Sequence, residues 1–177
     1  VHFPKNPAYV AAQKYAKAIA DLFKPMTESF NEIWLDGEKA ATVEYWQKDI
    51  AEFDLDKVRN YDNGRGIITG HPIEPIYGRT YLPKKFKMAV TVPGDNSVDL
   101  YINDIGCVVV MEPNGVDVKG LNIVVGGGMG RTHRKEETFA RAADHLGFVA
   151  RDDIFEALKA IIATQRDHGT REVRSSA

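Results

Sequence analysis

Lys85 and Lys87, two lysines separated by one residue, are the first candidates for a chemical role. Side chains of an extended strand alternate between faces, so both lysines point to one face while Phe86 and Met88 point to the other. Two ammonium groups side by side on a sheet face repel each other unless an anion or carboxylates lie between them. The pattern fits either a solvated sheet face or an anion site, and alternation alone does not separate the two.

A glycine-rich run, VGGGMGRTH at residues 125–133, follows an apolar segment. Consecutive glycines forgo side-chain packing, so they usually mark positive φ angles or a close backbone approach to a flat or bulky group. The run lacks the last glycine of GxGxxG and the Lys-Ser/Thr pair of a P-loop. The basic residues that follow favour an acidic ligand, and a surface loop with scattered charge is the alternative. The candidate residues are Gly126, Gly127, Gly128, Gly130, Arg131 and His133.

Other polar residues have plain structural interpretations. Arg166 and His168, in TQRDHG near the end of the last predicted helix, suit the negative end of a helix dipole without a ligand. Cys107, within GCVVVM, is typical of a buried small apolar residue rather than a nucleophile. The sequence contains neither HExxH nor GxSxG, and its histidines have no metal-ligand spacing.

The composition narrows the function classes. The chain has 177 residues, of which 44% are hydrophobic, and a formal net charge of −2. This balance gives no support for a nucleic-acid partner, and no apolar run approaches the roughly 20 residues that cross a membrane. The single cysteine rules out an intramolecular disulfide, a cysteine-rich zinc site and an iron–sulfur cluster held wholly by this chain. No signal-like apolar segment follows Val1, so secretion has no support.

Apolar spacing and turn signals predict the elements that position these residues. A helix is expected from Asn6 to Pro25 and a strand at Phe30–Leu35. A surface excursion from 41 to 76, with a short acidic helix at Val43–Phe53, comes next. Strand-like runs follow at Lys85–Val92, Ser97–Ile102, Gly106–Met111 and Gly120–Val125, and helices at Glu136–Leu146 and after Asp152 or Asp153. This order predicts an α+β fold, a mixed or antiparallel sheet of about five strands flanked by helices.

Six motifs extend over most of the chain in a fixed order. They are EIWLDGEK (32–39), EPIYGRTYLPKKFK (74–87), VPGDNSVDLYINDIG (92–106), LNIVVGGGMGRTH (121–133), ETFAR (137–141) and ATQRDHG (163–169). Together they resemble the sulfite/nitrite reductase family, and within it the assimilatory, ferredoxin-dependent sulfite reductase haemoprotein. A set of this length is far more specific than any one motif.

The resemblance implies a function and its cofactors. Family members reduce sulfite to sulfide at a sirohaem whose iron is bridged through a cysteine to a [4Fe–4S] cluster, and ferredoxin is the implied electron donor. Lys85 and Lys87 are then expected to hold the anionic substrate and help deliver protons. The glycines of the run, with Arg131 and His133, are expected near the macrocycle. A cytoplasmic location is implied, or the plastid stroma in a photosynthetic eukaryote.

Departures from the family pattern also matter. The four cluster cysteines of the family lie beyond this region, so residues 1–177 are interpreted as a single central domain of a longer reductase, inactive in isolation and completed by its remaining domains. Residues 41–70 match poorly and suggest an insertion, and residues 170–177 form a divergent tail. Lys87 favours the sulfite branch, because related nitrite reductases usually carry Asn there. Ferredoxin–nitrite reductase and a truncated, non-catalytic tetrapyrrole-binding module are the alternatives.

Overall fold

The computed structural model describes residues 6–26, 32–36, 38–42, 52–130, 133–134 and 138–172. The elements before the main sheet are the helix α1 (Pro7–Leu22), the strands β1 (Glu32–Leu35) and β2 (Glu38–Thr42), and the helix α2 (Leu55–Asn60). The sheet and the closing helix comprise β3 (Met88–Thr91), the 3₁₀ turn η1 (Leu100–Ile102), β4 (Ile105–Met111), β5 (Val118–Val125), β6 (Asp144–Ala150), the 3₁₀ turn η2 (Arg151–Asp153) and α3 (Ile154–His168). Among these residues no helix combines the length and hydropathy that a membrane span requires.

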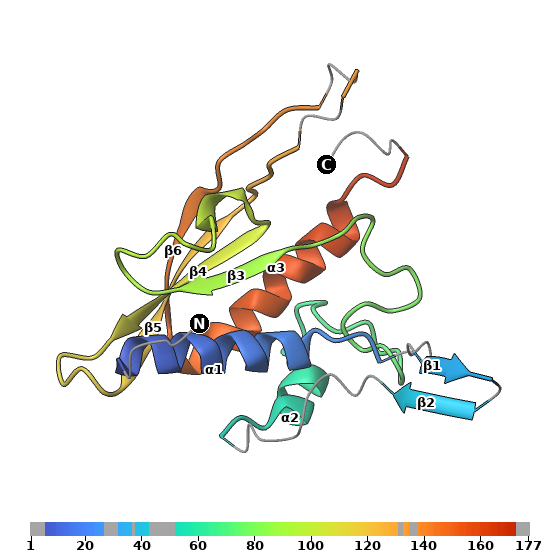
Figure 1. Ribbon diagram of the computed structural model, residues 1–177, viewed down its shortest axis with the longest axis horizontal. Coiled ribbons are helices and arrows are strands. Elements are labelled where there is room, and N and C mark those ends of the chain that lie inside the picture. Colours follow the sequence, from blue (N-terminus) through green and yellow to red (C-terminus); the bar gives the residue numbers. More distant parts are fainter. Residues whose placement is uncertain are drawn as a thin grey trace.

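The main sheet is mixed and has four strands in the order β3-β4-β5-β6. β3 runs parallel to β4, whereas β5 is antiparallel to both of its neighbours. β1 and β2 form a separate antiparallel pair that projects away from the sheet (Figure 1). The predicted α+β class is therefore confirmed, while the strands of the main sheet differ in number and identity from those expected.

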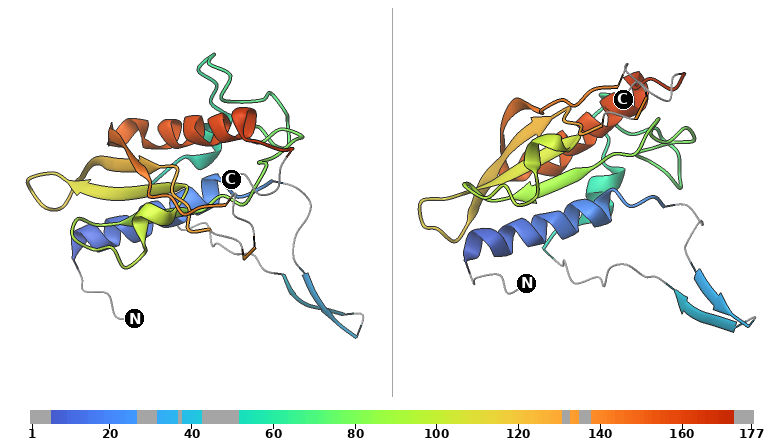
Figure 2. Two further views of the ribbon diagram at one scale, coloured as in Figure 1. Left: turned by 90° about the horizontal axis from the view of Figure 1, so that it is seen from above. Right: turned by 45° about the horizontal axis from the view of Figure 1, so that its top comes forward.

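Both long helices cover one face of the sheet (Figures 1 and 2). Ile105, Cys107 and Val109 of β4 alternate onto this face, are fully buried, and share one apolar core with residues of α1 and α3. The opposite face holds a smaller cluster around Leu100 and Val124, where η1 lies against the sheet. The molecule is thus a two-layer sandwich of helices on a sheet.

The two long helices begin close to where the sequence predicted. The Asn6 side chain accepts a hydrogen bond from the Ala8 N–H at 2.9 Å and caps α1, with Pro7 in the first turn. α3 begins at Ile154, directly after Asp153, although the Asp153 carboxylate makes no capping hydrogen bond. The start of α3 therefore depends on burial of its apolar stripe rather than on a cap.

The predicted strand at Ser97–Ile102 is wrong, because this segment forms turns and η1. Asp99 has a left-handed φ of 49°. The Asn96 side chain accepts from the Leu100 N–H at 2.8 Å, and the Asn103 amide donates to the Asp99 carbonyl at 2.9 Å. Asparagine side chains that bond the local backbone offer it an alternative to a strand ladder, and here that alternative prevails.

The predicted helix at Glu136–Leu146 is also wrong, since β6 occupies 144–150 and residues 135–137 lie outside the described ranges. Gly147, expected to end that helix, lies inside the strand with a φ of 140°. It faces Ile123 of β5, next to a register shift that bends the pair. Pairing with β5 overrides local helix propensity. Every residue of β6 is exposed except the half-buried Val149, so no alternation of buried and exposed side chains marks the strand in the sequence.

Residues 52–76, the described later part of the predicted surface excursion 41–76, contain several buried side chains, in contrast to that prediction. Leu55 and Ile67 are both buried, and Leu55 joins the main core. Residues 43–51, which include most of the predicted acidic helix, lie outside the described ranges.

Buried cations connect this irregular segment to the helices. The Arg59 guanidinium donates to the carbonyls of Asp21 and Leu22 at 2.9 and 3.4 Å, and so ties α2 to the end of α1. The Lys159 ammonium, with 0% exposure, donates to the carbonyls of Val58 and Tyr61 at 2.7 and 3.1 Å. α2 is thereby held to both long helices.

Arg166 acts in the same way further along α3. Its guanidinium donates to the Ile67 and Gly66 carbonyls at 3.1 Å each, and also to the Ile76 carbonyl. The sequence had suggested only a favourable dipole interaction for this residue. We refer to Arg59, Lys159 and Arg166 as the carbonyl clamps.

Candidate functional site

The sequence-predicted site residues that the structure describes gather at one end of the main sheet. Met88, Ile105, Val125 and Asp144 are paired across the four strands and form a row at this end. Segments that precede β3, β4 and β6 and the segment that follows β5 therefore meet here (Figure 1). Strand pairing thus brings the lysine motif and the glycine run together across a long stretch of sequence.

Lys85 and Lys87 lie just before β3, which begins only at Met88. Phe86 and Met88 pack against the core, so the predicted alternation of side chains holds although regular strand geometry does not extend to the lysines. Lys85 is exposed and Lys87 is half-buried. The Lys87 N–H donates to the Asp104 carboxylate at 2.7 Å, and this bond fixes the backbone beside β4.

The Lys87 ammonium has an uncharged hydrogen-bond partner. Its ammonium donates to the Ile102 carbonyl at 3.2 Å. Neither Lys85 nor Lys87 makes an ion pair with a residue in the described ranges. An ammonium bonded to one carbonyl keeps two further N–H donors and its full charge, which suits the binding of an anion.

The glycine run divides into two parts with different roles. Gly126 has a φ of 79° and donates to the Asp104 carbonyl at 2.9 Å. Gly127 is buried, and a Cβ there would lie 2.2 Å from the Tyr101 carbonyl oxygen. Gly127 is thus needed for tight packing of backbone against η1, and Gly126 for its positive φ and for the close approach of the Arg141 guanidinium, whatever binds nearby.

Gly128 and Gly130 have no such packing role. A Cβ at either position would meet no atom of the described residues within 4 Å, so both face open space in this part of the structure. Gly128 forms an antiparallel bridge with Arg141 through two backbone hydrogen bonds of 2.8 Å. The arms beyond this bridge carry Met129 and Phe139, which are 66% and 71% exposed. The open glycines and these apolar side chains together offer a surface suited to a flat apolar group.

Arg141 braces the loop, a role that the sequence did not reveal even though the residue lies in the ETFAR motif. Its guanidinium donates to the Gly126 carbonyl at 2.7 Å and pairs with the Asp144 carboxylate. The one available signal was the spacing of three residues between Arg141 and Asp144. His133 is exposed at a turn beside Arg134, which has a φ of 62°, and Arg131 lies outside the described residues.

Lys84 is a second residue that sequence reasoning missed. Its ammonium nitrogen is buried and has no hydrogen-bond partner in the described part of the chain. An unpaired ammonium costs several kcal/mol to bury, by order-of-magnitude reckoning, so such a group calls for an anionic partner. Lys84 directly precedes the lysine pair, and its buried ammonium favours a negatively charged partner from outside the described residues.

Cys107 has the structural role that was predicted. It is fully buried in β4, and burial raises the pKa of its thiol from 9.0 to about 12. A thiol with so high a pKa is neither a nucleophile nor a metal ligand at neutral pH. The described residues also contain no group of three or more His, Cys, Asp or Glu side chains arranged to hold a metal ion.

Comparisons with known proteins agree with the sequence resemblance. The family model for the nitrite and sulphite reductase 4Fe-4S domain matches residues 14–177. A ferredoxin sulfite reductase of Synechococcus elongatus is 50% identical over 175 residues, which are 99% of this chain and 26% of that protein. An NADPH sulfite reductase hemoprotein beta-component of Shewanella pealeana is 43% identical over 163 residues, covering 92% of this chain and 24% of that protein.

Among solved structures, the Mycobacterium tuberculosis NirA protein aligns at 31% identity and a TM-score of 0.42, over 54% of this chain and 16% of that one. The chain spans about a quarter of the length of the two curated relatives (26% and 24%). Because the family model extends over most of the described fold, from residue 14 to residue 177, the chain belongs to the nitrite and sulphite reductase 4Fe-4S domain family.

Proposed function

We propose that this chain is the central domain of a longer sulfite reductase that converts sulfite to sulfide on a sirohaem coupled to a [4Fe–4S] cluster. The observation that carries the proposal is the row of strand ends. Next to that row Lys85 and Lys87, which make no ion pair with a described residue, lie at the same end of the sheet as glycines that face open space.

The residues present fit sirohaem, a flat macrocycle edged with carboxylates. Gly128 and Gly130 leave room for a flat group, and the buried Lys84 ammonium requires an anion such as a carboxylate. We assign Lys84, the glycines of the run and, by resemblance, Arg131 and His133 to holding this cofactor. When bound, sirohaem and its coupled cluster supply the electrons of the reduction.

The cluster ligands must come from other parts of the protein. A [4Fe–4S] cluster is held by several cysteine thiolates. The only cysteine of this chain is Cys107, and its neutral thiol lies buried in β4. This chain therefore supplies cations and backbone to the site, and the remaining domains of the reductase supply the thiolates.

The lysines would act on the substrate anion. Sulfite carries negative charge, and fixed cations in a water-poor pocket stabilise it and the charge that develops as S–O bonds break. Each cleavage also consumes protons, which an ammonium group in contact with the anion can donate. The bond from the Lys87 ammonium to the Ile102 carbonyl, at 3.2 Å, holds that donor in place before substrate arrives.

Ferredoxin is the proposed electron donor, because the Synechococcus elongatus relative is a ferredoxin sulfite reductase. The cytoplasm, or the plastid stroma in a photosynthetic eukaryote, is the proposed location. Sulfite rather than nitrite is the proposed preferred substrate, because a second lysine at position 87 favours the anion with the higher charge.

The substrate preference is tested by replacing Lys87→Asn in the full-length protein and measuring the rates of sulfite and nitrite reduction. The ratio of kcat/KM for sulfite to that for nitrite should fall about tenfold or more, since one charged contact to a dianion is lost. Lys17→Gln, which removes an exposed cation of α1, is the control and should leave the ratio unchanged. An unchanged ratio in Lys87→Asn would refute the assignment of Lys87.

A further inference from the structure

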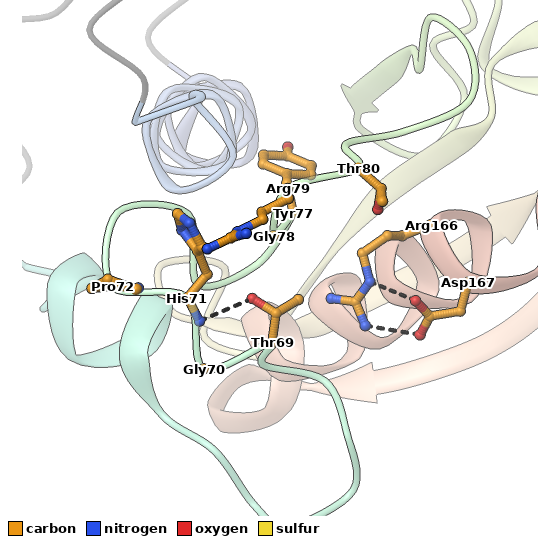
Figure 3. Close-up of a pocket in the computed structure, with 10 residues that line it drawn as sticks. All are labelled: Thr69, Gly70, His71, Pro72, Tyr77, Gly78, Arg79, Thr80, Arg166 and Asp167. Carbon is orange, nitrogen blue, oxygen red and sulfur yellow. Dashed lines mark hydrogen bonds and ion pairs between the residues drawn. The ribbon is translucent and has the colours of Figure 1, made fainter.

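A second concave site lies between the loop of residues 69–80 and the C-terminal end of α3 (Figure 3). Its volume is about 470 Å³, within the range of about 300–1,000 Å³ that is typical of small-molecule sites. The polar residues that line it are Thr69, His71, Arg79, Thr80, Arg166 and Asp167. Neither Lys85 nor Lys87 is among the lining residues, so the function proposed above leaves this cavity unexplained.

One wall of the cavity is already neutralised. Arg166 grips the Asp167 carboxylate with two hydrogen bonds, of 2.7 Å from Nε and 2.8 Å from Nη2 (Figure 3). The same bonds lower the pKa of Asp167, so this carboxylate stays ionised and paired. The remaining Arg166 donors are taken by backbone carbonyls. This wall therefore neither attracts nor repels an anion strongly.

His71 presents a fixed hydrogen-bond donor. Its Nδ1 accepts from the Glu74 N–H at 3.0 Å, so the neutral ring carries its proton on Nε2. The His71 N–H in turn donates to the Thr69 hydroxyl at 3.2 Å, a local bond within the same turn that fixes the His71 backbone. The Nε2–H is left for a ligand.

Arg79 supplies the charge. It is exposed, and its guanidinium makes no hydrogen bond or ion pair with another described residue. Gly78, with a φ of 62°, lets the preceding turn close against Thr69, since a Cβ at this position would lie 3.0 Å from the Thr69 methyl carbon. Figure 3 shows the Arg79 side chain extending toward the side of the cavity where His71 lies. The loop thus places both donors at one site.

We propose that this cavity binds the terminal oxyanion, a phosphate or a carboxylate, of a small organic molecule, with Arg79 as the forked donor and His71 Nε2–H as the second. Guanidinium groups bind such oxyanions in bidentate fashion. The cavity volume exceeds that of a bare anion, so the rest of the ligand lies against Pro72 and the Gly70 backbone.

The test is calorimetric titration of the full-length protein at low ionic strength with inorganic phosphate and, separately, with acetate. Arg79→Gln should weaken binding of the preferred probe about tenfold or more, and Arg79→Lys should recover part of the loss. His71→Asn should weaken it less, because Asn retains an acceptor for the Glu74 N–H. Lys17→Gln controls for the loss of one positive charge.

The results distinguish a phosphate ligand from a carboxylate ligand, and they distinguish this oxyanion site from the proposed sulfite site. Arg79-dependent binding of phosphate indicates a phosphate monoester, and Arg79-dependent binding of acetate indicates an organic carboxylate. If neither probe binds in an Arg79-dependent manner, the proposal is wrong. The kcat/KM for sulfite should be the same in Arg79→Gln as in the unmodified protein. A parallel loss of sulfite reduction would instead assign Arg79 to the sulfite site and overturn a separate oxyanion site.

Discussion

The sheet end and the irregular segment 52–80 both depend on cations, but they use them in opposite ways. The carbonyl clamps are Arg59 within the irregular segment and Lys159 and Arg166 on α3. They are buried, and each is bonded to at least two backbone oxygens. At the sheet end, Lys87 has one neutral partner and the buried Lys84 ammonium has no described partner. Buried cations bonded to two or more backbone carbonyls hold the fold, and cations with one partner or none among the described residues are available to a ligand.

Removing a clamp should produce the largest loss of stability. Arg166→Met leaves the Ile67 and Ile76 carbonyls buried without donors, and each unsatisfied group costs about 1–3 kcal/mol. We expect the free energy of unfolding to fall by about 3–5 kcal/mol in urea titration. Lys17→Met, at an exposed site on α1, should change it by less than about 0.5 kcal/mol. A small effect of Arg166→Met would show that the clamps do not support the fold.

Substitution of two neighbouring glycines, Gly127 and Gly128, should distinguish a packing role from a ligand-binding role at the sheet end. Gly127→Ala places a Cβ against the Tyr101 carbonyl and should destabilise the protein by about 2–3 kcal/mol in thermal unfolding. Gly128→Ala adds a Cβ in open space, so it should leave stability nearly unchanged while lowering sirohaem occupancy, measured by visible absorbance. Equal stability losses in the two variants would contradict this division of the run.

Cys107, in the sheet between the two regions, should affect stability only at alkaline pH, and its effect near neutral pH is the smallest of the three. The thiol pKa of Cys107 rises from 9.0 to about 12 on folding, so the folded state retains a proton that the unfolded state releases above pH 9. Stability should therefore fall as the pH rises from 9 toward 12, and Cys107→Ala should show a shallower fall. At pH 8 the folded protein should resist alkylation by iodoacetamide, as judged by mass spectrometry. Rapid modification under these conditions would mean that β4 opens readily.

Local sequence patterns predicted the elements whose signals are local. α1 has its Asn6 cap and an apolar stripe, and β4 alternates onto a buried face, so both were found close to their observed bounds. β6 was missed because almost all of its side chains are exposed and it is held by pairing with β5. Ser97–Ile102 was misread because asparagine side chains there bond the local backbone.

The candidate site, like the fold, was predicted only where residue type and local spacing mark it. Lys85, Lys87 and the glycine run stood out by residue type and spacing, and strand pairing brings them to one end of the sheet. The bracing role of Arg141 and the clamp role of Arg166 were not foreseen, because their partners are backbone carbonyls. Every residue has a carbonyl, so no sequence pattern marks the ones that a distant guanidinium will reach.

If the lysines at the sheet end serve a ligand and not the fold, removing the Lys87 charge should abolish most activity while leaving stability nearly unchanged. Lys87→Gln in the full-length protein should lower kcat/KM for sulfite about a hundredfold, the loss typical of removing one charge-stabilising donor. Its free energy of unfolding should stay within about 1 kcal/mol of the unmodified protein, because only one half-buried hydrogen bond, to the Ile102 carbonyl, is lost. Retained sulfite activity, or a loss of stability comparable to that of Arg166→Met, would contradict the account.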